Sequence, residues 1–482
     1  MERVPTGISG LDLILNGGYF RNSSYLVMGD VGTGKTIFSI QWLLDGIKKG
    51  EKCLYITLAE GVEQLLNNIS PFGWDLEALK IKDFSPQPSE LNHLGDYEIF
   101  FPSEVEEEPF WQQLYRTIEA EKPDRLVLDS VTVFHDLSAN EYSFRRRLIA
   151  FIKYLYQHRC TTIFLADAQE IKALVSISMA VDGVIKLHLR LSKARFITSR
   201  TIEILKFRGS DFLSGEHPFR ITSSGIKIFP HIIEHPRHNF KDQKIYSSGV
   251  QELDEMLGGG IEGGTVTLIT GPSGIGKSTL AAQFVTQIVS QGVPSVYYLF
   301  EEYLEMMFTR GQKVGIPLRE AMKKGLQVER INPLELLPDE FLEMVRQKVN
   351  QEGVRCVVLD SIRGYMLAME EFGNLRAHFY NLVAFLTSKG VTTFAVNEIE
   401  NVIGPLKISE IGISNLADNV ILMRYAEYEG KIIKVINCLK KRLGACQPEL
   451  REFEITDKGL KVGPPLDYMK GVLSGIPLIE RK

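Results

Sequence analysis

The sequence contains two copies of one pattern, and this internal repeat limits the possible folds more than any other feature. Residues 5–36 read PTGISGLDLILNGGYFRNSSYLVMGDVGTGKT, and residues 247–278 read SSGVQELDEMLGGGIEGGTVTLITGPSGIGKS. The two segments align without a gap, with Lys35 opposite Lys277 (277 − 35 = 242). A repeat of this size predicts two domains of the same fold in tandem.

Later landmarks extend the repeat. CLYITLAE at 53–60 pairs with SVYYLFEE at 295–302 at the same spacing, whereas RLVLDSV and CVVLDSI pair at a spacing of 231 (360 − 129 = 231). The first copy therefore carries 11 extra residues (242 − 231 = 11), which we place in the acidic stretch 96–109 and expect to form an exposed loop. The expected organisation is a first domain at 1–230, a linker at 231–246, a second domain at 247–462 and a tail at 463–482.

Short apolar runs alternate with amphipathic segments in both copies. SYLVMG and TVTLIT each lead into a glycine-rich turn, and segments of helical pattern follow these turns at 36–49 and 279–290. Buried strands that alternate with helices are typical of a mostly parallel sheet with helices on both faces. The sequence therefore predicts an α/β fold for each copy.

A phosphate-binding loop follows the first strand of each copy. Residues 29–36 (GDVGTGKT) and 271–278 (GPSGIGKS) both fit the pattern GxxxxGK[ST]. Glycines let successive backbone N–H groups face phosphate oxygens, and the next helix adds the positive end of its dipole. The motif predicts a P-loop NTPase with two ATP sites. The expected nucleotide-contacting residues are Gly32, Thr33, Gly34, Lys35 and Thr36, and Gly274, Ile275, Gly276, Lys277 and Ser278.

An aspartate ends an apolar run in each copy, RLVLD at Asp129 and CVVLD at Asp360. In P-loop NTPases the Walker-B aspartate lies at this edge of a strand beside the P-loop strand, where it holds the metal of the nucleotide. Mg²⁺ is therefore the expected metal, with Thr36 and Asp129 as its residues in the first copy and Ser278 and Asp360 in the second.

A carboxylate that activates water is expected at the end of the strand after the P-loop helix, as in RecA-like ATPases. The second copy has Glu301 and Glu302 there, whereas the first has Ala59 and Glu60. Neighbouring side chains on a strand point to opposite faces, so Glu60 does not simply replace Glu301. The expected catalytic residues are Glu301 and Glu302, with Glu60 left open between a catalytic and a structural role.

The combined features resemble the KaiC family, which carries two RecA-like domains. The resemblance rests on the duplication, both P-loops, FEE at 300–302, LKFRGSDFLSGEHPF at 205–219 and REFEITDKG at 451–459, and covers nearly the whole chain. It implies a homohexamer of two tiers with ATP between neighbouring subunits. By this resemblance, cations of one subunit reach the ATP of the next subunit, as transition-state charge requires. These cations are Lys206 and Arg208 in the first tier and Lys440 and Arg442 in the second, and Phe207 is a further expected nucleotide-contacting residue.

The resemblance also implies autokinase activity in the second domain. KaiC proteins phosphorylate an adjacent serine and threonine, and the matching residues here are Ser414 and Asn415. Asparagine cannot accept a phosphate, so Ser414 is the expected phosphoacceptor and any cycle has a single step at this place. Glu301 would take the proton of Ser414, with Glu302 assisting.

Partners are implied more weakly. The tail that includes GVLSGIP resembles the extension on which KaiA docks, and KaiB binds the first ring of the family. Ala59, Asn415 and Phe212, which stands where the family often has a histidine, indicate a divergent member. The expected function is that of an ATP-hydrolysing signalling or clock-type switch.

Composition separates the remaining alternatives. The net charge of −5 and the pI near 6.1 argue against broad nucleic-acid binding, so a DNA-acting recombinase or helicase is the weaker alternative. An assembly scaffold with little catalysis is the other alternative.

The five cysteines form no CxxC pair, which argues against a disulfide framework. The absence of an apolar run long enough for a membrane span leads us to expect a cytoplasmic protein.

Overall fold

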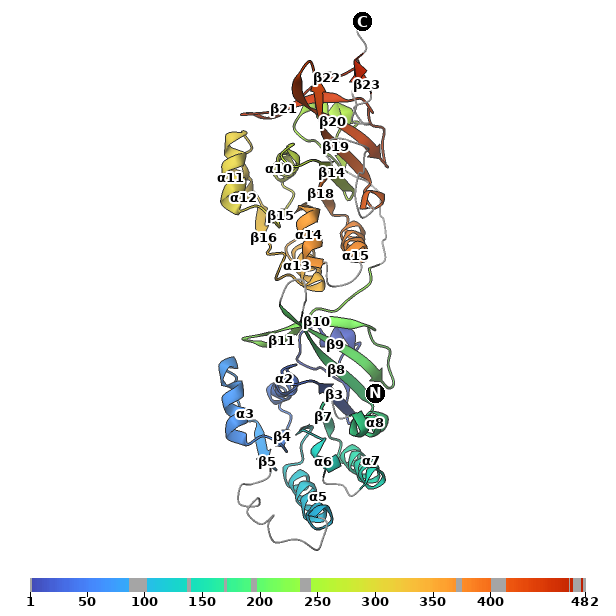
Figure 1. Cartoon of the computed structure of the whole chain (residues 1–482). Helices are drawn as coiled ribbons and strands as arrows, with labels where there is room; N and C mark the ends of the chain where they lie inside the picture. Colours follow the sequence, from blue (N-terminus) through green and yellow to red (C-terminus); the bar gives the residue numbers. More distant parts are fainter. Residues whose placement is uncertain are drawn as a thin grey trace. The chain divides into compact units, whose positions relative to one another are not determined.

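The computed structural model divides into two compact units, Met1–Ile232 and Ile233–Lys482. The structure describes residues 2–85, 102–136, 140–168, 171–191, 197–234, 244–369, 375–399, 413–467, 469–470 and 478–479. Each unit is built around one large sheet (Figure 1). Within these ranges, no helix is long and apolar enough to cross a membrane.

The first unit has a nine-stranded sheet in the order β11-β10-β9-β8-β3-β7-β6-β4-β5. The six strands from β8 to β5 run parallel, and β9, β10 and β11 extend the sheet as antiparallel strands. The strands are β3 (Ser24–Gly29), β4 (Cys53–Thr57), β5 (Lys80–Asp83), β6 (Arg125–Asp129), β7 (Thr161–Asp167), β8 (Gly183–Leu191), β9 (Thr198–Phe207), β10 (Glu216–Thr222) and β11 (Gly225–Ile228). A separate pair joins β1 (Arg3–Val4) to β2 (Tyr19–Phe20).

Helices give this sheet two apolar cores. One core gathers Phe38 and Trp42 of α2 with Tyr55 of β4, and the other gathers Trp111 of α5 and Phe151 of α7. The helices are α1 (Leu11–Ile14), α2 (Lys35–Lys48), α3 (Val62–Ile69), α5 (Pro102–Glu121), α6 (Val133–Asp136), α7 (Glu141–Gln157) and α8 (Ile171–Ala180), with a 3-10 turn, η1, at Ser70–Phe72. A core on each face requires strands without polar alternation, and β3 is buried along its whole length.

The second unit repeats this design with the order β16-β15-β17-β18-β14-β19-β20-β21-β22. Its strands are β14 (Val266–Gly271), β15 (Ser295–Leu299), β16 (Leu326–Arg330), β17 (Cys356–Asp360), β18 (Thr392–Glu398), β19 (Asn419–Tyr428), β20 (Lys431–Lys441), β21 (Arg451–Thr456) and β22 (Gly459–Pro465). Short pairs join β12 (Ile245–Tyr246) to β13 (Ile261–Glu262) and β23 (Met469–Lys470) to β24 (Leu478–Ile479). The helices are α9 (Gln251–Met256), α10 (Lys277–Ser290), α11 (Leu304–Lys313), α12 (Leu318–Lys323), α13 (Pro338–Asn350), α14 (Ile362–Met369) and α15 (Leu375–Ser388), with a 3-10 turn, η2, at Ile413–Asn415.

The predicted fold class is confirmed, because both units are mostly parallel sheets flanked by helices. The expected loop at 96–109 is wrong in its C-terminal part, where α5 begins at Pro102. Trp111, Leu114 and Ile118 recur at helical spacing and are buried against the sheet. This apolar face explains why the segment is helical, with the acidic run in its N-terminal part.

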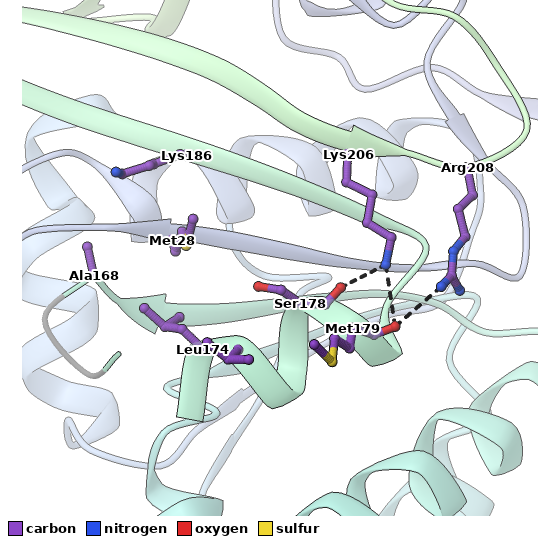
Figure 2. Close-up of a pocket in the computed structure, with 9 residues that line it drawn as sticks. Met28, Ala168, Leu174, Ser178, Met179, Lys186, Lys206 and Arg208 are labelled. Atoms are coloured by element: carbon purple, nitrogen blue, oxygen red, sulfur yellow. Dashed lines mark hydrogen bonds between the residues drawn. The ribbon is translucent and has the colours of Figure 1, made fainter. Parts of the chain in front are cut away.

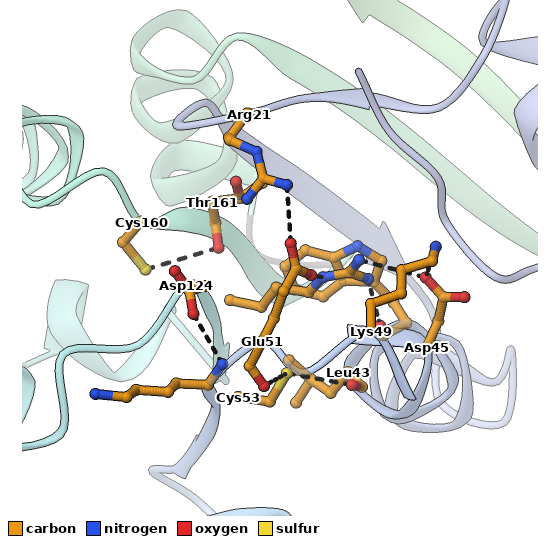
Figure 3. A network of polar contacts seen from close by, with 12 residues as sticks. Arg21, Leu43, Asp45, Lys49, Glu51, Cys53, Asp124, Cys160 and Thr161 are labelled. Atoms are coloured by element: carbon orange, nitrogen blue, oxygen red, sulfur yellow. Dashed lines mark hydrogen bonds and ion pairs between the residues drawn. The ribbon is translucent and has the colours of Figure 1, made fainter. Parts of the chain in front are cut away.

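A buried charge network distinguishes the first unit from the second. The Arg125 guanidinium is 1% exposed and donates to Glu51 at 2.5 Å, to Asp45 at 3.3 Å and to the Trp42 carbonyl at 2.7 Å. Figure 3 shows Glu51 also bound by Arg21 at the edge of this network. The second copy has a cysteine at the position of Arg125 (125 + 231 = 356), so the fold itself does not need this charge.

Candidate functional site

The P-loop of the second unit turns sharply between β14 and α10. Gly276, at the start of α10, has φ 120°, and a Cβ there would lie 2.6 Å from Ile455 Cδ1. A Cβ on Gly271 would lie 2.4 Å from the Met423 carbonyl oxygen. The Met423 carbonyl leaves no room for a side chain at Gly271, and the φ of Gly276 is one that other residues rarely adopt, so the loop forms a backbone cradle of the kind that phosphate oxygens occupy.

Lys277 lies inside this cradle and is 7% exposed. Its Nζ donates to the Pro272 carbonyl at 2.8 Å. Burial lowers the pKa of Lys277, while the nearby carboxylates of Glu398, Asp360 and Glu301 act in the opposite direction. The ammonium group is therefore held at the floor of an acidic hollow, where it can meet a phosphate.

Asp360, at the end of β17, accepts a hydrogen bond from the Tyr297 hydroxyl at 2.7 Å and another from the Ser278 hydroxyl. Burial raises the pKa of Asp360, and these two hydrogen bonds oppose that shift. A hydroxyl and a carboxylate side by side are hard oxygen donors of the type that Mg²⁺ prefers. The donor set of Ser278 and Asp360 therefore fits a magnesium ion.

The two glutamates after β15 take different partners. Exposed Glu301 accepts a hydrogen bond from the Ser361 hydroxyl at 2.6 Å, whereas Glu302 pairs with Arg310 at 3.0 Å. Burial raises the pKa of Glu302, and Arg310 lowers it. Glu301, Glu302, Lys277, Ser278 and Asp360 all line one hollow of about 390 Å³, so the structure brings these predicted residues together.

Glu398 also lines this hollow, and the sequence reasoning missed it. It ends β18, where its backbone is directly opposite Gly271 in the parallel register, and Arg363 lies 3.7 Å from it. The repeat held a signal, because the aligned segment of the first copy, TTIFLAD, ends in an acidic residue at the same place, Asp167.

In the first unit, Asp167 forms an ion pair with the P-loop lysine. Lys35 Nζ lies 2.6 Å from Asp167 Oδ1 and donates to the Gly29 carbonyl at 2.7 Å. Gly34 has φ 101°, and a Cβ there would lie 2.8 Å from Ile221 Cδ1. The first cradle therefore has the same backbone requirements as the second.

Asp129 repeats the arrangement of Asp360. It accepts hydrogen bonds from the Thr36 hydroxyl at 3.3 Å and from the Tyr55 hydroxyl. Burial raises the pKa of Asp129, and both hydrogen bonds oppose the shift. Thr36 and Asp129 thus form a second hydroxyl and carboxylate pair that fits Mg²⁺.

The carboxylate position is where the two sites differ. Ala59 is exposed and offers no carboxylate, and Ser130 hydrogen-bonds to Thr132 at 2.6 Å instead of to a glutamate. Glu60 is half-buried and accepts from Asn68 at 2.6 Å. Burial and the charge of Asp129 raise the pKa of Glu60.

Lys206 of β9 and Arg208, which follows the strand, line a separate hollow of about 710 Å³ (Figure 2). Lys206 donates to the carbonyls of Ser178 at 2.7 Å and Val181 at 2.6 Å. Arg208 is exposed and donates to the Met179 carbonyl at 3.3 Å. The residues that line this hollow include neither Lys35 nor Asp129, so this hollow is distinct from the P-loop site of the first unit.

Phe207, between these cations, is buried and stacks on Phe20 and Tyr25 with centroid separations of 5.6 and 5.7 Å. Its side chain belongs to the core and is not available to a ligand. The equivalent Lys441 is also directed inward and pairs with Glu262 at 2.9 Å.

Lys440 of β20 and Arg442, which follows the strand, lie against the segment of Ser414. Lys440 Nζ donates to the Ala417 carbonyl at 2.6 Å and to the Ser414 carbonyl at 3.2 Å. Arg442 forms an ion pair with Asp418 at 2.9 Å and donates to the Asn415 carbonyl at 3.4 Å. The structure therefore joins the predicted phosphoacceptor segment to the predicted cations.

Comparisons with known proteins identify the family of this chain. A protein-family model described as "ATPase: KaiC" matches residues 4–232 and 246–467. The chain is 29% identical over 490 residues to the circadian clock oscillator protein KaiC of Thermostichus vulcanus, covering 99% of this chain and 92% of the relative. It is 28% identical over 494 residues to the circadian clock protein KaiC3 of Synechocystis sp., covering 99% and 95%. With a KaiC match across both repeats, the chain belongs to the KaiC ATPase family and is a KaiC-like ATP-binding protein.

Proposed function

We propose that this KaiC-family ATPase hydrolyses ATP chiefly in its second site, transfers phosphate to Ser414, and acts as a hexameric signalling or clock-type switch. The observation that supports this most strongly is the hollow of the second unit. It holds a P-loop lysine, a hydroxyl and carboxylate pair and a hydrogen-bonded Glu301 within about 390 Å³.

Each residue of this hollow has a distinct role in the proposal. The backbone of Gly274, Ile275 and Gly276 cradles the phosphates, and Lys277 neutralises their charge. Ser278 and Asp360 hold Mg²⁺, which supplies charge neutralisation at the phosphates when bound.

Glu301 orients the attacking group and accepts its proton. Its carboxylate is exposed to the hollow, and the Ser361 hydroxyl fixes its orientation from the side of the metal aspartate. A positioned carboxylate can serve either water or a serine hydroxyl, because both must lose a proton as they attack phosphorus. Glu302 is held by Arg310 and assists through its charge.

The first site binds nucleotide and hydrolyses it slowly. Lys35, Thr36 and Asp129 match the second site, which supports binding of ATP and Mg²⁺. Gly32, Thr33 and Gly34 supply the backbone of the cradle. Ala59 removes the base, and Glu60 is occupied by Asn68, which supports a role in assembly more than in turnover.

Neighbouring subunits complete both sites in this proposal. Lys206, Arg208, Lys440 and Arg442 rest mainly on backbone carbonyls and on Asp182 and Asp418. In the first unit these cations lie in a hollow apart from the P-loop, which supports a role toward the phosphates of an adjacent subunit. Ring assembly then couples hydrolysis in one subunit to the next. KaiA-like and KaiB-like proteins are the proposed partners, and much of the tail that would serve the former lies outside the described residues.

Ser414 is the proposed acceptor because Lys440 ties its backbone to the strand that carries the cations. Asn415 limits phosphorylation at this place to one group. Hydrolysis of that phosphoserine, or its persistence, would give two states of the ring with different local charge.

The test is peptide mass spectrometry of purified protein after incubation with Mg·ATP. The wild type should gain one phosphate on Ser414, and Ser414→Ala and Glu301→Gln should both lose it. Ser290→Ala serves as the control, because Ser290 is an exposed hydroxyl at the end of α10. ATP consumption without phosphate on Ser414 would contradict the autokinase proposal, and turnover that needs single-stranded DNA would favour a DNA-acting motor.

A further inference from the structure

Two cysteines of the second unit lie close together. Cys438 lies on β20 and is 1% exposed, and Cys446 is half-buried in the segment that follows the strand. The Cys446 Sγ donates to the Cys438 carbonyl oxygen at 3.8 Å, and the Cys438 Sγ donates to the Lys440 carbonyl oxygen at 3.6 Å. The chain thus places two sulfur atoms together across a short turn.

Hydrogen bonds to its backbone hold the segment that contains Cys446 in this position. The Asn437 side chain donates to the carbonyls of Pro448 at 2.7 Å and Glu449 at 3.1 Å. The Gln447 N–H donates to the Met256 carbonyl at 2.9 Å. Hydrogen bonds of the residues that follow Cys446 therefore hold its backbone beside β20.

The turn between the two cysteines carries the basic residues of the proposed intersubunit contact. Lys441 anchors it, because its buried ammonium pairs with Glu262 and donates to the carbonyls of Leu257 and Gly260. Lys440 and Arg442 lie on the other side and contact the segment of Ser414. A covalent link between Cys438 and Cys446 would close a ring that contains all three cations.

The first unit reaches the same local fold without thiols. Ile204 and Phe212 occupy the equivalent positions (438 − 204 = 234 and 446 − 212 = 234), and both belong to one apolar cluster. Two apolar side chains can therefore fill this place, so packing alone does not require a pair of cysteines.

We propose that Cys438 and Cys446 form a redox-modification site that closes to an intramolecular disulfide and restrains the turn of Lys440 and Arg442. The oxidant is a low-molecular-weight disulfide such as oxidised glutathione. The Cys446 thiolate attacks one sulfur of the oxidant, forms a mixed disulfide and releases one glutathione thiol. Cys438 then attacks the Cys446 sulfur, forms the protein disulfide and releases the second glutathione.

The order of attack follows from exposure. Cys446 is the more exposed thiol, and burial raises the pKa of Cys438 to about 12. Cys438 is therefore a poor first nucleophile but lies beside the sulfur that it must attack. Reversible disulfides of this kind can occur in reducing compartments as regulatory devices.

The effect on turnover rests on the proposed function, whereas the disulfide itself does not. Closing the ring removes torsional freedom from the segment that presents Arg442, an exposed side chain that must reorient to reach a neighbouring nucleotide. Oxidation should therefore lower turnover in the second site, and dithiothreitol should restore it.

The test is exposure of the folded full chain to oxidised glutathione, followed by alkylation and non-reducing tryptic digestion. Trypsin cleaves after Lys434, Lys440, Arg442 and Arg451, so a disulfide would join the peptides VINCLK and LGACQPELR. We expect this linked pair in the wild type and in Cys356→Ser, and its loss in Cys446→Ser. A glutathione adduct on Cys446 without the linked pair, or two unreacted thiols, would overturn the proposal.

Turnover of the same samples separates the two proposals. A linked pair with lowered turnover that recovers on reduction supports the restraint of the turn, and Cys446→Ser should be insensitive to the oxidant. A linked pair with unchanged turnover would overturn that restraint and leave the ATPase intact. If the reduced protein has no turnover, the proposed function fails, and the linked peptides still report on the disulfide.

Discussion

Glu301→Gln tests the chemistry of the second site most selectively. Glutamine has nearly the same shape, and its carbonyl oxygen can still accept the Ser361 hydrogen bond that Glu301 accepts at 2.6 Å. The site should therefore keep its geometry, its affinity for nucleotide and the contacts of Ser278 and Asp360. Only the ability to accept a proton is lost.

The expected loss in turnover follows from this role. A positioned general base contributes about 10²–10⁴-fold to rate, or about 2.7–5.4 kcal/mol of transition-state stabilisation. Phosphate release should be measured in a Lys35→Ala background, so that the first site does not contribute. Glu305→Gln is the matched control, because Glu305 is 79% exposed and pairs with Arg319 on the next helix.

A particular combination of results would refute this reasoning. If Glu301→Gln binds nucleotide normally and retains the turnover of the Glu305→Gln control, Glu301 is not the base. A loss of turnover that accompanies an equal loss of nucleotide affinity would assign Glu301 a binding role instead.

Three further predictions concern stability and binding. Arg125→Met should destabilise the first unit by about 3–5 kcal/mol in chemical unfolding, because Glu51 loses a buried partner; a loss below about 1 kcal/mol would contradict the buried network. Burial raises the pKa of Asp360 in the folded state above its value in the unfolded chain. The ionised carboxylate is therefore unfavourable in the folded protein, so the free energy of unfolding decreases as pH rises above the unfolded pKa, and this destabilisation disappears as pH falls. Asp360→Asn should thus raise the melting temperature of the nucleotide-free protein at neutral pH and reduce the further rise on adding Mg·ATP to what the first site supplies, and a lowered melting temperature would contradict this. Gly276→Ala should weaken nucleotide binding at the second site about tenfold or more, because strained backbone costs about 1–3 kcal/mol. Gly292→Ala, with φ 80° and open space around it, should leave binding unchanged, and equal effects in titrations would remove the steric argument.

The features that could be predicted from the sequence are those encoded by short, contiguous motifs. The P-loops, Asp129 and Asp360 are predicted from short runs of neighbouring residues, and the structure places Thr36 beside Asp129 and Ser278 in the same hollow as Asp360. The helix α10 was expected from position 279 and begins at Lys277, since the P-loop lysine already has helical geometry.

The roles of Asp167, Glu398 and Arg125 could not be predicted from the sequence, because they depend on strand register and burial. Asp167 and Glu398 join their sites because β7 and β18 place them opposite Gly29 and Gly271, and this pairing is not visible along the chain. Arg125 reads as an ordinary charge at the start of a strand, although the fold buries it.

The most direct test of the central claim assigns turnover to one site. Steady-state phosphate release should be compared for Lys35→Ala and Lys277→Ala, with nucleotide binding measured on the same samples. The account predicts that Lys277→Ala loses most of the turnover while Lys35→Ala retains most of it, because only the second site has the Glu301 base. Turnover that persists in Lys277→Ala and disappears in Lys35→Ala would contradict the account.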